Sequence, residues 1–179
     1  IARAWLVYEL TNEVTMLGVV MLASALPMLF FSLFGGVMTD RLQKKNVLQI
    51  GQIALAVVAL GVAGTIIADK ISLLRHDGVE YVLIASAVQG MVIGLMMPAR
   101  QAMIPEIVGS ERLMNAVALS AAGMNINRLL APGVAGFIIA VSGIQTVYLI
   151  MTGLYLIGVL LVAIMRPTET AVPVNKGSL

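Results

Sequence analysis

An arginine lies near the middle of one of the long apolar runs of this sequence. Arg128 falls inside the run from Leu113 to Ser142 and is flanked by Asn125 and Asn127. A charge at the centre of a bilayer costs about 2.5–3.5 kcal/mol on insertion scales, so this side chain must face protein or water. Arg128 could bind an anionic or polar ligand or a titrating carboxylate. Equally, it could anchor neighbouring helices, and the sequence leaves both interpretations open.

A glutamine occupies another apolar run, in the segment "SAVQGMVIG". The Gln89 amide could line a cavity or hydrogen-bond another helix, and the sequence slightly favours the second role. Gly90 and Gly94 follow at the small-xxx-small spacing that lets two helix backbones approach closely. Glycine is also simply common in membrane helices, so the spacing alone does not decide between the two explanations.

Methionine is abundant, with 12 residues. Flexible thioethers such as those of Met96, Met97 and Met124 suit a pocket that accepts varied apolar compounds. More often, methionines of this kind face lipid or fill the core.

Charge is concentrated in the stretch "GGVMTDRLQKKNVL", between two apolar runs. Gly36 is followed there by Asp40, Arg41, Lys44 and Lys45. Basic residues beside a membrane span fix its orientation, because loops rich in Lys and Arg stay on the cytoplasmic side. The glycine and the aspartate add a second possibility, a latch in which Asp40 faces the N-terminus of another helix.

Residue types that usually carry catalysis or metal binding are scarce. Cysteine is absent, and the single histidine, His76, has no partner at metal-ligand spacing. No Gly-x-x-x-x-Gly-Lys loop is present in this sequence, so we do not expect ATP to be the direct energy source. The net charge of +2 is too small to suggest nucleic-acid binding. We therefore expect no metal, no cofactor, no nucleic-acid partner and no enzymatic activity.

Composition identifies an integral membrane protein, because 60% of the residues are hydrophobic, only 11% are charged and the mean hydropathy is +1.00. A helix needs about 20 mostly apolar residues to span a bilayer. Continuous apolar runs without period-two alternation favour helices over barrel strands, so the predicted fold is an all-α transmembrane bundle. The five predicted spans are roughly Val14 to Met38, Val47 to Ala68, Tyr81 to Pro98, Leu113 to Ser142 and Thr146 to Met165.

Two segments outside these spans have their own predictions. The opening "ARAWLVYEL" fits the last turns of an earlier span, with Trp5 and Tyr8 at interfacial depth, although an exposed surface helix is the alternative. The segment "ARQAMI", bracketed by Pro98 and Pro105, predicts a short bent stretch rather than a continued helix.

The loops predict the orientation of the bundle. One side carries seven basic residues and the other only Lys70 and Arg75, so the first side is expected to be cytoplasmic and His76 to lie outside. We expect a multi-pass protein of the inner (plasma) membrane, with residues 1–165 as the transmembrane unit and 166–179 as the start of a cytoplasmic linker. The seven basic residues are Arg41, Lys44, Lys45, Arg100, Arg112, Arg166 and Lys176.

The charged stretch resembles the signature loop of the major facilitator superfamily, Gly-x-x-x-Asp-Arg-x-Gly-Arg-Lys-x-x-Leu. Gln43 stands where that family usually has glycine. The resemblance implies that Asp40 and the basic residues interact across two halves of the protein and form a cytoplasmic gate. The residues in register are Gly36, Asp40, Arg41, Lys44, Lys45 and Leu48.

A second resemblance is to the branch of this superfamily that holds the macrolide efflux proteins and the enterobactin exporter. Together, the two resemblances cover essentially the whole chain. They imply most of an N-terminal six-helix half, with the first helix mostly missing. Pro132, Gly133 and Gly136 resemble part of an antiporter motif, which implies a hinge, and a kinked helix that only packs against its neighbours is the alternative. The residues that carry this resemblance are Pro98, Arg100, Ala102, Pro105, Glu111, Leu113, Asn115, Arg128, Pro132 and Gly136.

The resemblance implies efflux of a drug, macrolide or siderophore-like small molecule by alternating access, as a proton-driven antiporter. Its expected partners are that small molecule, the lipid bilayer and a missing C-terminal half of the same chain. The candidate transport pathway comprises Gln89, Asn125, Asn127 and Arg128. Ser86 occupies the position of an arginine found in proton-coupled members, and no acidic residue lies at mid-membrane depth in these spans. A non-transporting membrane scaffold or assembly subunit is the alternative.

Overall fold

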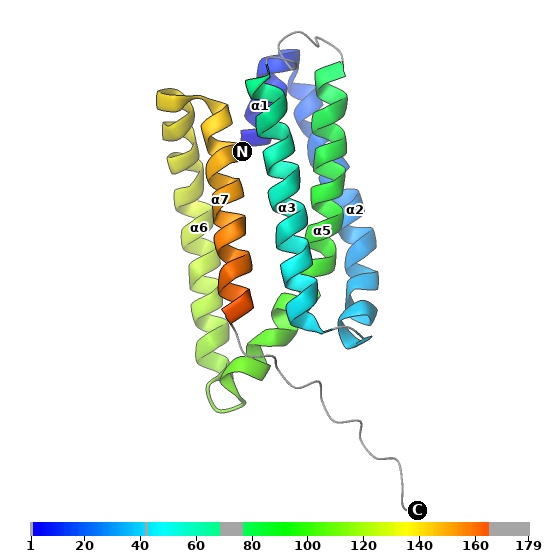
Figure 1. The fold of residues 1–179 in the computed structure, drawn as a ribbon, viewed down its shortest axis with the longest axis vertical. Helices are drawn as coiled ribbons and strands as arrows, with labels where there is room; N and C mark the ends of the chain where they lie inside the picture. The colour runs from blue at the N-terminus through cyan, green and yellow to red at the C-terminus, as the bar shows by residue number, and fades with distance from the viewer. Residues whose placement is uncertain (1, 42, 69–76, 165–179) are drawn as a thin grey trace, which may run out of the picture.

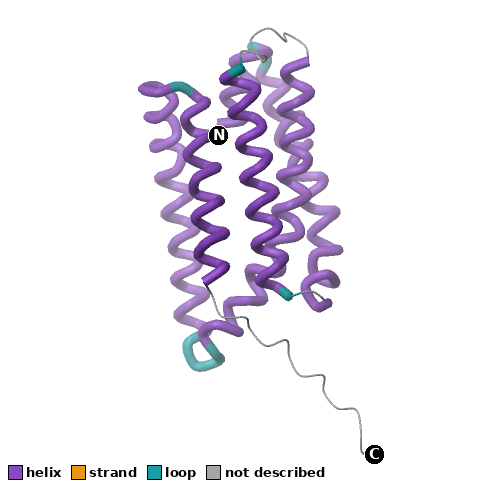
Figure 2. The backbone as a smooth tube through the Cα atoms, in the orientation of Figure 1, coloured by secondary structure: helices purple, strands orange, loops and turns teal. Residues whose placement is uncertain are grey.

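The computed structural model describes residues 2–41, 43–68 and 77–164, which form a bundle of helices (Figure 1). Every regular element in these ranges is helical, as the tube in Figure 2 shows, so the predicted all-α fold is confirmed. Five of the helices are long and apolar enough to cross a membrane. The predicted linker 166–179 and His76 lie outside the described residues. The helices are α1 (Ala2–Thr11), α2 (Val14–Arg41), α3 (Lys44–Ile67), α5 (Asp77–Val108), α6 (Leu113–Ser142) and α7 (Ile144–Ile164).

Short turns separate several of these helices. Between α1 and α2, Asn12 takes a left-handed conformation with a φ of 54°, which asparagine tolerates better than most residues. Gly143 ends α6 with a φ of 80°, a conformation that costs glycine little because it has no Cβ. The chain therefore reverses within one residue, and α7 runs back beside α6 (Figure 1).

The prediction that a separate segment lies between Pro98 and Pro105 is wrong, because α5 continues as a single helix through both prolines to Val108. The lower part of α5 does bend aside from the axis of its upper part (Figure 1). Ala99 and Met103, between the prolines, are buried against α3 and α7. We attribute the continuity to this packing, which offsets the hydrogen bonds that the prolines cannot donate.

A close crossing of α2 and α5 forms one side of the bundle. A methyl group at Gly94 would lie 2.5 Å from the Met28 carbonyl oxygen, and one at Gly90 would overlap the Ser24 carbonyl oxygen. Both glycines are buried. Of the two explanations that the sequence leaves open for Gly90 and Gly94, the structure shows the close approach, and α2 is the helix that they meet.

Helix α3 lies between α5 and α7 and carries buried residues along its whole length. Two clusters surround it. The first cluster has buried members on α1, α2, α3, α5 and α7, with Ile139 of α6 packed against it, and the second joins α3, α5 and α7. Buried members of the first are Leu6, Val7, Val20, Ala59, Val62, Ala63, Val82, Ile144 and Tyr148; those of the second are Val47, Leu48, Ala99, Met103 and Val162.

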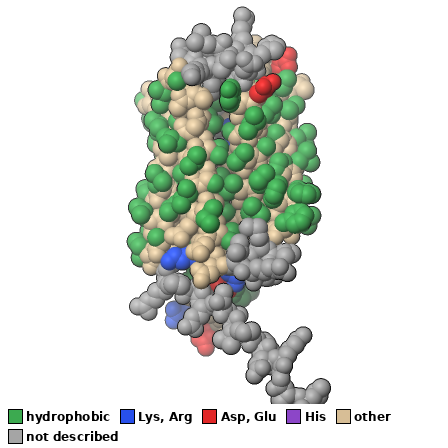
Figure 3. Space-filling model, turned by 45° about the vertical axis from the view of Figure 1, so that its right-hand side comes forward, with side chains coloured by type: hydrophobic (Ala, Val, Ile, Leu, Met, Phe, Trp, Pro, Cys, Tyr) green, Lys and Arg blue, Asp and Glu red, His purple; other side chains and the backbone are tan. Residues whose placement is uncertain are grey.

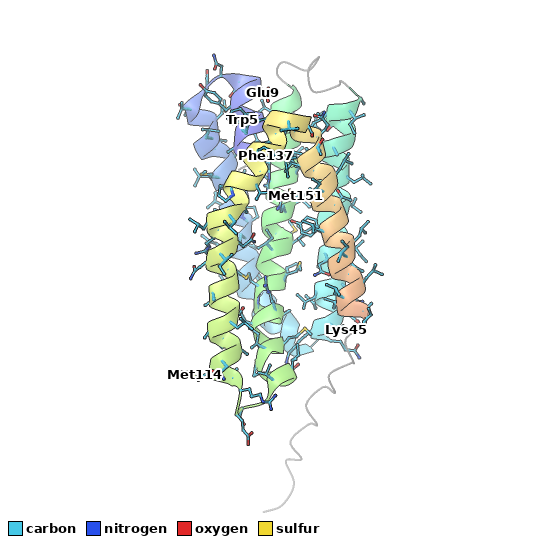
Figure 4. All side chains as sticks on the ribbon, turned by 90° about the vertical axis from the view of Figure 1, so that its left-hand side faces the viewer. Trp5, Glu9, Lys45, Met114, Phe137 and Met151 are labelled. Carbon is cyan, nitrogen blue, oxygen red and sulfur yellow. The ribbon has the colours of Figure 1, made fainter. Side chains whose placement is uncertain are left out.

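Helix α6 lies at the margin of the bundle beside α7 (Figure 1) and has no buried residue. Apolar side chains cover the flank of the molecule seen in Figure 3, whereas the charged ones gather at its two ends. This distribution is that of a bundle surrounded by lipid hydrocarbon. We call the end that carries Lys44, Lys45, Arg100 and Arg112 the basic end, and Figure 4 shows Lys45 there, with Trp5 and Glu9 at the opposite end.

Candidate functional site

The charged turn between α2 and α3 makes contacts within this bundle. Lys44 forms an ion pair with Glu106, near the end of α5. The Lys45 Nζ donates a 2.8 Å hydrogen bond to the Ala163 carbonyl oxygen at the C-terminal end of α7. A cation is favourable there because the carbonyls of the last helical turn lack helical partners. These two lysines therefore connect α3 to α5 and to α7 at the basic end.

The remaining predicted gate residues lie next to this turn. Asp40 and Arg41 belong to the last turn of α2, and their side chains are outside the described part of the structure. An added Cβ at Gly36 would meet no atom within 4 Å among the described residues. It is Gly35 that packs against α5, where an added Cβ would lie 3.0 Å from the Gly94 carbonyl oxygen. The interaction of this turn with a second half stays a prediction.

The three predicted pathway residues of α6 are all exposed. Asn125, Asn127 and Arg128 have no hydrogen-bond or ion-pair partner among the described residues. An added Cβ at Gly133 or at Gly136 would also meet no described atom within 4 Å. The predicted pathway and hinge residues of α6 therefore share a helix that has little packing within this bundle.

Gln89, in contrast, lies in a cavity between helices. The cavity has a volume of about 340 Å³, and side chains from α1, α2, α5 and α7 line it. Arg3 of α1 donates a hydrogen bond from its guanidinium to the Gln89 Oε1. The Gln89 amide thus both lines a cavity and bonds another helix, so its two predicted roles coincide. The lining residues are Arg3, Ala4, Val20, Met21, Ser24, Gln89, Tyr148 and Met151.

Local packing explains why these side chains meet. Leu6 and Val7 are buried and anchor α1, and Arg3 lies one turn before them on the same helix face. Gln89 immediately precedes Gly90, whose missing side chain lets α5 approach the Ser24 backbone of α2. The close glycine crossing therefore brings α2 and α5 to the same cavity.

Tyr148 completes this cavity from α7. Its side chain is only 4% exposed, and its hydroxyl has no hydrogen-bond partner among the described residues. Leaving a buried hydroxyl unpaired costs about 1–3 kcal/mol, which makes such a group unusual in a folded protein. Met151 lies one turn further along α7 and lines the same cavity (Figure 4).

Neither Arg3 nor Tyr148 is among the site residues predicted from the sequence. Arg3 precedes two inward-facing residues at helical spacing, which is the signal that could have placed it on the inner face of α1. Tyr148 belongs to the same kind of pattern on α7, where Ile144, Val147 and Thr152 are also buried. Ser86, at the position where the resemblance has arginine, is fully buried and donates to the Val82 carbonyl oxygen at 2.6 Å.

Two further cavities lie nearer the basic end and are mainly apolar. One, of about 270 Å³ between α3 and α5, includes Met96. The other, of about 430 Å³ between α5 and α6, includes Met97 and Met124 and has Arg100 among its lining residues. All three methionines singled out in the sequence therefore line cavities.

The sequence pattern of the transmembrane secretion effectors of the major facilitator superfamily matches residues 1–177. The chain belongs to this family. It is similar to the staphyloferrin A transporter of Staphylococcus aureus, with 25% identity over 169 residues, 94% of this chain and 41% of that protein. It is also similar to the quinolone resistance protein NorA of Staphylococcus aureus, with 29% identity over 126 residues, 70% of this chain and 30% of that protein.

These matches agree with the helical membrane bundle described above. The name of the first relative describes a transporter and that of the second a resistance protein, and neither names an enzyme. The chain spans less than half the length of either relative. No solved structure gives a significant match.

Proposed function

We propose that this chain is part of an efflux transporter that carries a drug-like or siderophore-like small molecule across the membrane by alternating access. The polar cavity at Arg3 and Gln89, lined by four helices of an otherwise apolar bundle, is the observation that carries this proposal. Membership of the secretion effector family and the names of the two relatives support it. In such transporters the substrate site lies between helices near the membrane midplane.

The energy source in this proposal is a proton gradient, used by antiport. The described acidic side chains lie towards the ends of helices or in turns, as Glu9, Glu80, Glu106 and Glu111 do. The carboxylate that couples protons to substrate would therefore belong to another part of the full-length protein. Asn125, Asn127 and Arg128 on the exposed α6 would face the same pathway.

The proposed location is the inner (plasma) membrane, with the basic end in the cytoplasm. Lys and Arg gather at this end, which agrees with the positive-inside rule. The end of α2 with Gly36, Asp40 and Arg41, the start of α3 with Lys44 and Lys45, and the turn between them would then form a cytoplasmic gate against the C-terminal half. The contacts of Lys44 and Lys45 with α5 and α7 would hold this turn in place.

Transport by the full-length protein in bacterial cells that lack their own efflux pumps tests this function. Cells are loaded with a fluorescent quinolone or with a radiolabelled siderophore, and its loss is followed with and without a protonophore. We expect faster loss in cells that make the protein, and we expect the protonophore to abolish the difference. Equal loss from cells with and without the protein, for both compounds, would favour the scaffold alternative.

A variant pair links this activity to the cavity. Gln89→Ala should slow extrusion several-fold at unchanged expression, because it removes the amide that holds the Arg3 guanidinium. Val57→Ala, on the exposed face of α3, is the control and should leave extrusion unchanged. An effect of equal size in both variants would mean that helix stability, and not the cavity, controls transport.

A further inference from the structure

The cavity between α1, α2, α5 and α7 has more hydrogen-bond donors than acceptors. A guanidinium has five N–H groups, and the described contacts of Arg3 use one donor nitrogen, which bonds to Gln89. The Tyr148 hydroxyl has no partner among the described residues. The Ser24 hydroxyl already donates to the Met21 carbonyl oxygen at 2.9 Å. The unused N–H groups of Arg3 are therefore available to a molecule in the cavity, and the Tyr148 hydroxyl is a buried donor of the same lining without a described partner.

The charge in this cavity is also unbalanced. No aspartate or glutamate belongs to its described lining, and Arg3 makes no ion pair with any described residue. A cation within the membrane is costly unless an anion or water compensates it. An anionic group in the cavity would neutralise Arg3 and at the same time accept the hydrogen bond that the Tyr148 hydroxyl lacks.

We propose that this cavity binds the carboxylate of an amphipathic organic acid, with Arg3 and Tyr148 as its donors. Arginine suits a carboxylate because two parallel N–H groups can bind its two oxygens. The volume of about 340 Å³ exceeds that of a carboxylate alone. Val20, Met21 and Met151 line the remaining space and would contact the apolar body of the acid.

This proposal rests on the proposed function, because it names the substrate class for the same site. The guanidinium would disfavour a cationic molecule, so the site would select acids over amines of similar size. The same carboxylate chemistry could also come from an aspartate or glutamate elsewhere in the full-length protein. A side chain of that kind would pair with Arg3 permanently and would compete with an added acid.

Binding to the purified full-length protein separates this proposal from the transport function, since it requires no gradient. The probes are a quinolone carboxylic acid, a hydrophobic aryl carboxylic acid and the methyl ester of each, and isothermal titration calorimetry measures their affinities. We expect the wild-type protein to bind the acids at least tenfold more tightly than the esters. If the wild-type protein binds the acids but does not extrude them, the proposed transport function is contradicted and the proposed binding site is not.

Two variants and one control test whether Arg3 and Tyr148 cause the preference for acids over esters. Arg3→Gln should weaken acid binding about 10–100-fold and ester binding little, because a charge-assisted bond is lost. Tyr148→Phe removes only the hydroxyl and should weaken acid binding about 2–10-fold. Tyr81→Phe, at an exposed tyrosine of α5 outside the cavity, is the matched control and should bind as the wild type does.

Arg3→Lys serves where Arg3→Gln lowers the yield of folded protein, since it keeps the charge but loses the paired N–H geometry. Its acid affinity should fall between those of the wild type and Arg3→Gln. Equal affinity for acids and esters in the wild type would overturn the proposal. An acid preference that survives both Arg3→Gln and Tyr148→Phe would also overturn it. The same holds if Arg3→Gln lowers thermal stability without changing the acid preference, because Arg3 would then pair with a carboxylate side chain of the protein.

Discussion

Gly94 of α5 lies against the backbone of Met28 on α2, so closely that a methyl group on Gly94 would come within 2.5 Å of the Met28 carbonyl oxygen. Lipid provides no hydrophobic driving force between helices, so contacts of this kind are a main source of helix association in membranes. One turn earlier, Gly90 makes the equivalent contact with Ser24. The crossing of α2 and α5 therefore both stabilises the bundle and positions Ser24 and Gln89 at the cavity.

Enlarging Gly94 tests this crossing. Gly94→Ala should lower the free energy of unfolding by about 1–3 kcal/mol, because the new methyl group meets backbone atoms that cannot move aside easily. The measurement is unfolding of the purified full-length protein in mixed micelles with increasing SDS. Gly64→Ala on α3 is the control, since its Cβ would meet no described atom within 4 Å. Equal stability of the two variants would show that the crossing is looser than described.

The ion pair between Lys44 and Glu106 joins α3 to α5 at the basic end, with 26% and 29% of the two side chains exposed. Partly exposed pairs of this kind contribute little, so a double-mutant cycle with Lys44→Gln and Glu106→Gln should give a coupling of about 0.2–1 kcal/mol. The same SDS titration measures it, and added salt should reduce it. A coupling above about 2 kcal/mol would mean that the pair is more deeply desolvated than its exposure indicates.

The orientation of the bundle can be tested directly because the chain contains no cysteine. Glu13→Cys lies in the turn between α1 and α2, and Ser110→Cys lies in the turn between α5 and α6, at the basic end. Both side chains are exposed. In a full-length protein without other cysteines, a membrane-impermeant maleimide should label Glu13→Cys in intact cells and Ser110→Cys only after the membrane is opened. The reverse pattern would place the basic end outside the cell.

Composition and local periodicity predict the fold well because both are properties of single segments. The run Leu113–Ser142 was predicted with the bounds that α6 has in the structure. The continuation of α5 through Pro98 and Pro105 could not be predicted in this way. It depends on Ala99 and Met103 packing against α3 and α7, and those partners are distant in the sequence.

The candidate site also contains some residues that the sequence predicts and others that only the structure reveals. Gln89 and Arg128 were recognised because a polar side chain within an apolar run stands out locally. Arg3 was missed because its importance depends on a contact with Gln89, 86 residues away. Tyr148 resembles an ordinary interfacial or core tyrosine until its buried hydroxyl is found without a described partner.

Arg128 offers a test between the two roles that its sequence position allows. It follows Met124 by four residues on α6, so it lies on the helix face that lines the cavity between α5 and α6. If Arg128 serves the transport pathway, Arg128→Ala should reduce extrusion by the full-length protein several-fold at unchanged expression and thermal stability. Arg128→Lys should restore part of the activity, because it keeps the positive charge.

The control for Arg128 is its neighbour Leu129, which is 78% exposed and lies on a different face of α6. Leu129→Ala should leave both extrusion and stability unchanged. A purely structural Arg128 would behave differently: Arg128→Ala would then lower the melting temperature, while extrusion per folded molecule would stay at the wild-type rate. Two measurements therefore distinguish a pathway residue from a helix anchor: extrusion per folded molecule, and thermal unfolding. Loss of a pathway residue lowers the rate of extrusion per folded molecule, whereas loss of a helix anchor lowers the amount of folded protein.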